Sequence, residues 1–378
     1  MKIKHLLVLF AGSLVGPLSA HKIAHQPPEE SKVQLAILLD TSGSMNGLIE
    51  QTKTQLWKVV NTFIGAKKDG KAPFVEVALY EYGNSRLDHK AQWVRQIQPL
   101  TRDLDQVSED LFGLTTSGGD EFCGAVITRA MADLKWDPSP QVYKAIFIAG
   151  NESFTQGPIS PQEACREAIA KGVVVNTIHC GREDIGLSGE WNAGQLLAEG
   201  SFLVIDHNAA VVHIAAPQDA EIMKWNAAIN ETYIPFGGKA GAAKKEKQVK
   251  QDGNSVAKKE SGAHVQRALA KASQNYWNGS WDLCDACHAG KVDWTTLKDE
   301  DLPKEMRKLD LEGRKKYVAD HQAKRTVIQK KIQDLNKARS AFVAGKRKEL
   351  VVENTLDVAV TKTVRDQAAK KGYQFKQK

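Results

Sequence analysis

The feature that most constrains the fold of this chain is an almost continuous apolar run at residues 33–39 (VQLAILL), which ends at Asp40. Such a run is typical of a strand buried on both faces, as in a parallel sheet covered by helices. An amphipathic segment follows at 47–64, and strand and helix patterns then alternate as far as residue 206. The alternation predicts an α/β fold with a doubly wound, mostly parallel sheet.

The remaining elements of this pattern are expected at strands 74–82, 92–97, 143–149, 173–179 and 202–206, and at helices 103–112, 123–135, 161–171 and 190–199. The strands at 74–82 and 92–97 are close in sequence, so the second is expected to form one antiparallel edge strand. Beyond residue 262 the pattern becomes mainly α-helical, at 264–285 and 303–350. In the second stretch the three-four spacing of apolar residues favours an α-hairpin or a short coiled coil, carried by Ile328, Ile332, Leu335 and Phe342.

The N-terminus carries the pattern of a secretory signal peptide at residues 1–20. Lys2 and Lys4 precede a short apolar stretch at 6–18, and small residues stand before the expected cleavage site after Ala20. The apolar stretch is shorter than the ~20 residues of a membrane-spanning helix. We therefore expect an exported protein, periplasmic or secreted, with no transmembrane segment after signal cleavage.

Charge divides the chain into two parts. Residues 239–378 hold 32 Lys and Arg against 18 Asp and Glu, a net charge of +14, whereas the whole chain carries only +7. Residues 1–238 are therefore acidic, at −7. The basic clusters could bind nucleic acid, but export argues against this partner, and an anionic envelope surface is the better physical match. Two further readings are a solvated helical face and docking of the basic part on the acidic part.

One short motif carries the candidate chemistry. Asp40-Thr41-Ser42-Gly43-Ser44-Met45 follows the first buried strand and precedes an amphipathic helix, where ligands bind in open α/β sheets. The carboxylate of Asp40 and the hydroxyls of Ser42 and Ser44 are hard oxygen donors, and so small a set suits Mg²⁺, which keeps several waters. The simpler alternative is that the serines only cap the following helix.

At this motif the chain resembles the von Willebrand factor A (VWA) domain family, over roughly residues 32–215. Asp40, Ser42 and Ser44 match the metal-ion-dependent adhesion site of that family. The resemblance implies a VWA/Rossmann-like fold and a bound divalent cation, Mg²⁺ or else Mn²⁺ or Ca²⁺. It also implies a partner protein whose Asp or Glu carboxylate completes the coordination. The stretch from Ala149 to Gly181 is similar to a subgroup of exported bacterial VWA proteins with a basic helical C-terminal region.

The sequence departs from the family pattern in two loops. The second loop of the family motif corresponds to residues 115–121, and Asp120 stands there where the family usually has a Thr. At the end of the fourth core strand, Gly150 stands where the family usually has an Asp. One carboxylate has thus moved from one loop to another, which predicts a metal site of Asp40, Ser42, Ser44 and Asp120. Thr116 and Glu152 are predicted as supporting groups. The alternative is a degenerate site that binds metal poorly.

Two observations concern the five cysteines. Cys165 and Cys180 are expected near the same edge of the sheet, so a disulfide between them is one reading and two buried thiols the other. Cys284-Asp285-Ala286-Cys287-His288 is a formal attachment motif for haem c in an exported protein. A short amphipathic helix with core residues is the better interpretation of the same residues, and a local redox pair is a third. Cys284, Cys287 and His288 therefore form only a minor candidate site for haem.

These inferences divide the chain into a signal peptide at 1–20, a linker at 21–31, a VWA domain with a trailing helix at 32–236, a flexible basic linker at 237–262, a helical domain at 263–355 and a basic tail at 356–378. The function expected is a metal-ion-dependent, adhesion-type protein-binding module. No nucleophile elbow or zinc-binding motif is found, which favours a protein that is not an enzyme. The alternatives are a structural envelope protein with a vestigial metal site and a haem or redox protein.

Overall fold

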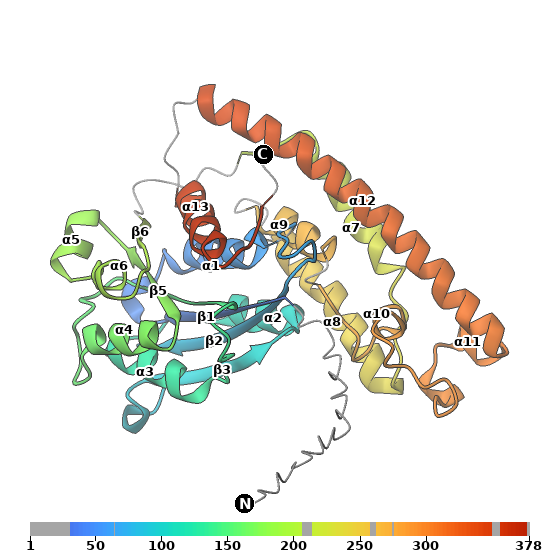
Figure 1. The fold of residues 1–378 in the computed structure, drawn as a ribbon, viewed down its shortest axis with the longest axis horizontal. Helices are drawn as coiled ribbons and strands as arrows, with labels where there is room; N and C mark the ends of the chain where they lie inside the picture. Colours follow the sequence, from blue (N-terminus) through green and yellow to red (C-terminus); the bar gives the residue numbers. More distant parts are fainter. Residues whose placement is uncertain are drawn as a thin grey trace, which may run out of the picture. The chain divides into compact units, whose positions relative to one another are not determined.

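In the computed structural model, the described residues are 31–63, 65–205, 214–257, 262–273, 276–349 and 356–375. The predicted signal peptide and the linker up to residue 30 lie outside them. From Ser31 onward the chain forms one compact unit (Figure 1). No described helix is both long and apolar enough to cross a membrane.

A single sheet lies at the centre, in the strand order β3-β2-β1-β4-β5-β6. All neighbouring strands are parallel except β3, which is antiparallel to β2 at one edge. This is the doubly wound sheet with one antiparallel edge strand that the sequence predicts. The strands are β1 (Lys32–Asp40), β2 (Phe74–Tyr82), β3 (Val94–Thr101), β4 (Tyr143–Gly150), β5 (Val173–Cys180) and β6 (Phe202–Ile205).

Helices cover both faces of the sheet, as Figure 1 shows. Because successive strand residues point to opposite faces, Leu35 and Ile37 of β1 face one core and Ala36 and Leu38 face the other. The first core is closed by α1 (Ile49–Thr62) and α2 (Leu104–Gly113). The second is closed by α3 (Cys123–Asp133), α4 (Pro161–Ala170) and α6 (Ala193–Leu197), and the short helix α5 (Glu183–Ser188) follows β5.

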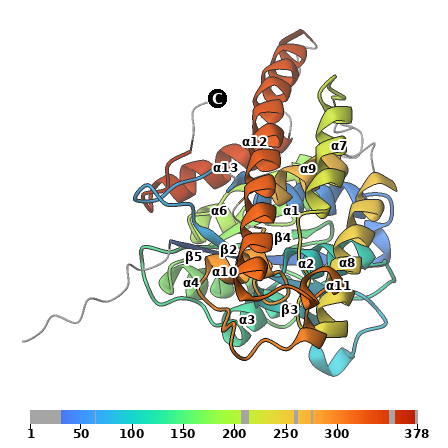
Figure 2. The same ribbon diagram turned by 90° about the vertical axis from the view of Figure 1, so that its right-hand side faces the viewer.

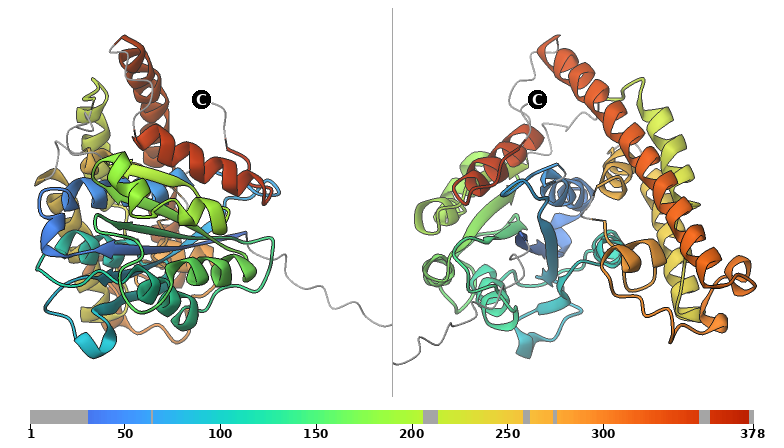
Figure 3. Two further views of the ribbon diagram at one scale, coloured as in Figure 1. Left: turned by 90° about the vertical axis from the view of Figure 1, so that its left-hand side faces the viewer. Right: turned by 45° about the vertical axis from the view of Figure 1, so that its right-hand side comes forward.

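The C-terminal region is helical, as predicted, and is dominated by α12 (Leu311–Glu349), which is roughly 58 Å long at 1.5 Å per residue. The helix α7 (Asp219–Asn230) packs along it, as Figure 2 and Figure 3 show. The pair is antiparallel, because Arg339 binds Asp219 while Arg325 binds Thr232 at the other end. The other helices are α8 (Gly238–Ala257), α9 (Ala263–Lys271), α10 (Leu283–His288), α11 (Lys304–Arg307) and α13 (Leu356–Ala369).

The segment 237–262, expected to be a flexible linker, instead forms α8 over most of its length. Its contact face is polar, with Gln248 and Gln251 buried, so the sequence offers no apolar stripe to reveal a helix. Lys244 binds Asp103 beside α2, with 2.8 Å between Nζ and Oδ2, and Lys247 binds Glu109 on α2. Of the readings for the basic part, docking on the acidic part is therefore the one that these contacts fit.

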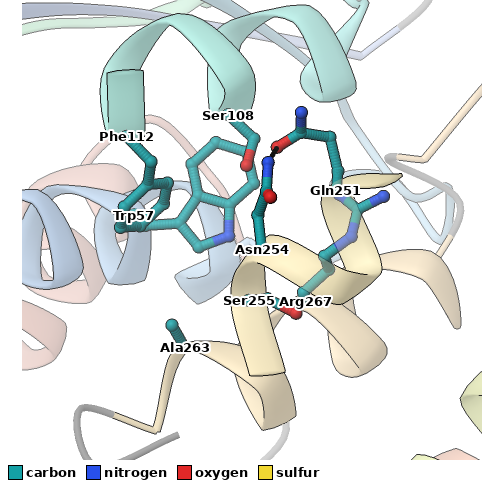
Figure 4. A pocket seen from close by; sticks show the side chains of 8 residues that line it. All are labelled: Trp57, Ser108, Phe112, Gln251, Asn254, Ser255, Ala263 and Arg267. Carbon is teal, nitrogen blue, oxygen red and sulfur yellow. Dashed lines mark hydrogen bonds between the residues drawn. The ribbon is translucent and has the colours of Figure 1, made fainter. Parts of the chain in front are cut away.

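A buried charge cluster joins α2 to α8 and α9. Arg267 lies between two carboxylates, 2.8 Å from Asp105 Oδ1 and 2.6 Å from Asp252 Oδ1, and Lys271 Nζ lies 2.6 Å from Asp252 Oδ2. Beside this cluster the surfaces fit closely, because the cavity in Figure 4 between Trp57 and α8 holds only about 10 Å³. That space holds about one water molecule.

The segment 356–378, expected to be a basic tail, instead contains α13, which packs on α1 (Figure 1). Val360 and Val364 are fully buried in the same core as the sheet, and Tyr143 Oη donates to Gln367 Oε1 at 2.7 Å. The last described helix thus completes the core of the first domain. The remaining boundaries of the predicted domain division stay predictions.

Candidate functional site

The candidate site lies at the carboxyl end of β1, where the strand gives way to a turn and a short 3₁₀ helix at Gly43–Met45. Asp40 is the last residue of β1 and is fully buried. Its Oδ1 accepts a hydrogen bond of 2.7 Å from the backbone N–H of Ser42, which fixes the carboxyl group. Its Oδ2 is buried and has no hydrogen-bond partner among the described residues. A buried acceptor without a partner is costly, and a bound water or cation would satisfy it.

The hydroxyl groups of the motif form a chain that starts next to Asp40. Ser42 Oγ lies 2.9 Å from Ser44 Oγ, which donates to Asn151 Oδ1 at 2.9 Å. Ser42 is buried and Ser44 is exposed, so the chain runs from the interior to the surface. Asn151 follows β4, and its backbone lies close enough to Asp40 to lower the pKa of that carboxyl against the effect of burial. The predicted residues Asp40, Ser42 and Ser44 are therefore brought together, and Asn151 joins them directly.

The second loop presents a different carboxylate from the one predicted. Asp120 is exposed and Thr116 partly exposed, whereas Glu121 is buried at 6% exposure and lies close enough to Ser42 for that side chain to lower its pKa against the effect of burial. A Cβ at Gly83 would lie 2.8 Å from Asp40 Oδ1 and 2.9 Å from Glu121 Cγ, so both acidic side chains border the same small space. Glu121 is not among the residues predicted from the sequence, because the family resemblance points to Asp120, the residue aligned with the family Thr. The sequence does not show that Glu121, rather than Asp120, is buried.

Close backbone contacts hold the second loop against the motif. Ser117 N donates to Thr41 O at 3.0 Å, and Asn84 Nδ2 donates to Thr115 O at 3.0 Å. A Cβ at Gly119 would overlap Gly83 O, so glycine at position 119 lets the loop lie directly on the turn after β2. These contacts between the second loop and the turns after β1 and β2 place Glu121 next to Ser42.

The space of the missing family Asp is occupied. A Cβ at Gly150 would lie 2.5 Å from Tyr82 Oη and 3.0 Å from Trp191 Cη2, so no longer side chain fits there without displacing them. Tyr82 Oη donates to Ala149 O, and Trp191 Nε1 donates to Glu152 O at 2.6 Å. Gly150 is thus fixed by packing. The side chain of Glu152, predicted as a supporting group, is exposed and close enough to Glu121 to raise its pKa.

The two buried carboxyl groups disfavour each other's charge. The pKa of Asp40 is raised to about 7, mainly by burial and also by the charge of Glu121, although polar contacts with Ser42 and Asn151 oppose the shift. Burial also raises the pKa of Glu121. Neither carboxyl has an ion-pair partner in the part of the chain that the structure describes. A nearby cation would remove this penalty.

The donor set fits a hard divalent cation. It contains two carboxylates, two hydroxyls and an amide oxygen, the ligand types that Mg²⁺, Mn²⁺ and Ca²⁺ prefer. Within the described ranges no group of three or more His, Cys, Asp and Glu side chains is placed to hold a metal. The site therefore depends on its hydroxyls as well as its carboxyls.

The cysteines do not form the suspected bridge. All five are free thiols, and Cys165 and Cys180 lie in the cores on opposite faces of the sheet. The sequence pattern does not distinguish the two faces of the sheet, so it left the disulfide and the two buried thiols as alternatives. Burial raises the pKa of each of these two thiols to about 12, which keeps them protonated and unreactive.

The haem-type motif lies on α10, as a short helix with core residues. Cys284 is buried in a small core, and its Sγ lies 3.8 Å from both Thr232 O and Val318 O. Cys287 is partly buried and His288 is exposed. A thioether at Cys284 would displace these neighbours, so the side chains at this motif do not fit a haem.

Comparison with known proteins identifies the first domain. Residues 34–187 match the family model of the von Willebrand factor type A domain. No curated protein matches the chain. Residues 34–187 contain the motif, the second loop and the end of β4.

Several solved structures are similar at low identity. Proximal thread matrix protein 1 from the mussel byssus is 18% identical, with a TM-score of 0.37 over 48% of this chain and 43% of that one. A form of it with a zinc-occupied MIDAS motif is 14% identical over the same shares, with a TM-score of 0.35. BatB from Bacteroides thetaiotaomicron is 16% identical, with a TM-score of 0.36 over 46% of this chain and 90% of that one. The present chain thus spans less than half of the mussel protein.

The sheet order, the Asp40 motif at the end of β1 and the family match agree with one another. Residues 34–187 of this chain are a von Willebrand factor type A domain.

Proposed function

We propose that this protein is an exported binding module that holds a divalent cation at Asp40 and uses it to bind a carboxylate of a partner protein. The observation that carries the proposal is Asp40 Oδ2, a buried oxygen without a partner beside two hydroxyls and a second buried carboxyl. The match of residues 34–187 to the family model of the von Willebrand factor type A domain supports it. The signal-peptide pattern at residues 1–20 supports export.

Each residue of the site has a part in this proposal. Asp40, Ser42 and Ser44 would hold the cation, while Asn151 positions Ser44 and Glu121 borders the same space as Asp40. The backbone N–H of Ser42 keeps one oxygen of Asp40 engaged, so the other is directed at the ion. A bound Mg²⁺ or Mn²⁺ would supply an open coordination position for a carboxylate oxygen of the partner. The protein would carry out no catalysis of its own.

Thermal unfolding tests the metal part of the proposal. A cation that binds only the folded protein raises the unfolding midpoint by mass action. We expect the midpoint to rise when Mg²⁺ or Mn²⁺ replaces EDTA, and the rise to vanish in Asp40→Asn. Asp320→Asn, which changes an exposed carboxyl on α12, is the matched control and should keep the rise. A rise of equal size in Asp40→Asn would overturn the assignment.

Affinity capture tests the partner part. The purified protein is incubated with an extract of the source cells in Mg²⁺ or in EDTA, and the captured proteins are compared. A partner should be recovered in Mg²⁺ only, should be lost with Asp40→Asn, and should lose binding when one of its own Asp or Glu residues is changed to the amide. Capture that survives EDTA and Asp40→Asn would favour a structural role with a vestigial metal site.

A further inference from the structure

A second candidate site lies away from the metal motif. A cavity of about 210 Å³, open to solvent, lies where α1, α9, α12 and α13 meet. On the same measure a single water molecule needs only about 10–15 Å³. The cavity is therefore large enough for an anion of several heavy atoms. Nothing in the proposed metal-binding function uses it.

The lining of this cavity is cationic. Lys58 comes from α1, Arg339 and Arg347 from α12, and Arg365 from α13. None of the described residues that line it is acidic. Between the cations lie neutral groups that can donate hydrogen bonds, among them Asn61, Gln266, Asn336, Ser340 and Thr361. Positive charge from three helices thus converges on one space, which favours an anion with more than one negative charge.

The cations of the lining are held in different ways. Arg339 Nε is bound to Asp219 Oδ1 at 2.6 Å, so its charge is largely balanced and its position fixed. Arg365 is half-buried, its guanidinium lies 5.4 Å from the centre of the Phe375 ring, and its Nε has no hydrogen-bond partner among the described residues. Burial without a balancing carboxylate lowers the pKa of Arg365. A buried guanidinium donor without an acceptor is costly, and an anion in the cavity would supply one.

We propose that this cavity is a binding site for a phosphate-bearing anion, held by Arg347, Arg365 and Lys58. Guanidinium groups match phosphate oxygens in a two-pronged geometry, and the surrounding amides and hydroxyls can donate to the remaining oxygens. Asn61 Oδ1, which is buried and has no donor among the residues that the structure describes, would accept from a protonated phosphate oxygen. Because its walls belong to α1 of the VWA domain and to the C-terminal helices, the anion would also bind these helices to one another.

Calorimetric titration of the full chain with pyrophosphate, and separately with inorganic phosphate, tests this site. Both titrations use a constant ionic strength set with NaCl. The cavity variant is Arg347→Gln with Arg365→Gln. The matched control is Lys330→Gln with Lys370→Gln, which removes the same charge from exposed positions on α12 and just after α13. We expect one pyrophosphate to bind per chain, about a hundredfold more weakly to the cavity variant, because two charge-assisted contacts are lost. The control should bind as the unchanged protein does.

A third arm identifies the source of the phosphate group. Vesicles of phosphatidylcholine with phosphatidic acid are sedimented with each protein, and vesicles of phosphatidylcholine alone serve as the blank. Binding to the phosphatidic acid vesicles that requires Arg347 and Arg365, without binding of pyrophosphate, would identify a lipid headgroup. If the unchanged protein binds neither probe, or if the cavity variant binds as well as the control, the proposal is overturned. Circular dichroism of both variants confirms that each is folded.

Discussion

At the scale of single residues, the candidate site is shaped as much by glycines as by its polar groups. Gly83 permits Glu121 and Asp40 to approach each other, and its φ of 78° lies in the region that glycine adopts without strain. Gly150 leaves its space to Tyr82 and Trp191. The absence of the family Asp at position 150 is therefore a packing feature, and Glu121 is the second buried carboxyl beside Asp40.

Gly150→Ala tests this packing. The new Cβ would lie 2.5 Å from Tyr82 Oη, so we expect the free energy of unfolding in urea to fall by about 1–3 kcal/mol. Gly345→Ala is the matched control, because a Cβ there meets nothing within 4 Å. Gly345 lies within α12, so the control should be neutral or slightly stabilising. Equal stability of the Gly150→Ala variant and the control would contradict this explanation of the departure.

At the scale of elements, the C-terminal helices are attached through buried charge rather than through an apolar seam alone. Asp252 of α8 holds both Arg267 and Lys271 of α9, and it also accepts from the side-chain amides of Asn226 and Asn230 on α7. Burial lowers the pKa of Lys271 to about 8, although Asp252 opposes this shift. Removal of the Asp252 charge would leave Lys271 buried without its counter-ion.

Asp252→Asn should therefore be strongly destabilising at pH 7, by about 3–5 kcal/mol in urea unfolding, as for other broken buried ion pairs. Asp366→Asn breaks an exposed pair with Lys362 on α13 and should cost less than about 1 kcal/mol. A similar decrease in the free energy of unfolding in both variants would show that the buried charge cluster stabilises the fold no more than an exposed ion pair does.

The same variant gives a test by pH. Burial would raise the pKa of Asp252, but Lys271 and Arg267 together outweigh burial and hold it below its ordinary value of 3.8. A depressed carboxyl pKa contributes stability that is fully present above about pH 4 and is lost as the pH falls through the native pKa. We expect the difference in unfolding free energy between the unchanged protein and Asp252→Asn to shrink below pH 4. A difference that stays constant from pH 7 to pH 3 would contradict the charge account.

At the scale of the whole molecule, the helix α13 packs against the first domain of the chain. The helix α13 is separated from the sheet by more than a hundred residues in sequence, yet Val360 and Val364 lie in the main core beside α1. The VWA domain is thus completed by a segment outside residues 34–187. The C-terminal region and the domain should unfold together, as single compact units do.

Val364→Ala tests this coupling. Val364 is fully buried, so we expect a loss of about 2 kcal/mol and a single shifted transition seen equally by tryptophan fluorescence and by circular dichroism. Val358→Ala changes an exposed position on the same helix and should have little effect. Two separate transitions, with only one of them shifted by Val364→Ala, would show that α13 belongs to a domain of its own.

The sequence predicts the elements whose position depends on a pattern of apolar residues. It does not predict the elements whose position depends on polar contacts. The apolar run before Asp40 predicts β1, because strands buried on both faces have a distinctive composition. It also predicts that the motif follows the carboxyl end of this strand, where Ser42 lies beside Ser44. The helix α8 was missed because its buried face is made of Gln and charged residues. The second acidic residue was assigned to Asp120 because no periodicity distinguishes it from Glu121 in an irregular loop.

In the cation site that we propose, Asp40 binds the ion and the nearby carboxyl of Glu121 strengthens its binding. Titration with Mn²⁺, followed by the loss of the free-ion signal in electron paramagnetic resonance, measures it directly. We expect one Mn²⁺ to bind per chain and none to bind to Asp40→Asn. Binding of Mn²⁺ should be weaker in Glu121→Gln and nearly unchanged in Asp120→Asn. Binding that persists in Asp40→Asn, or that is lost in Asp120→Asn while Glu121→Gln is unaffected, would contradict the account.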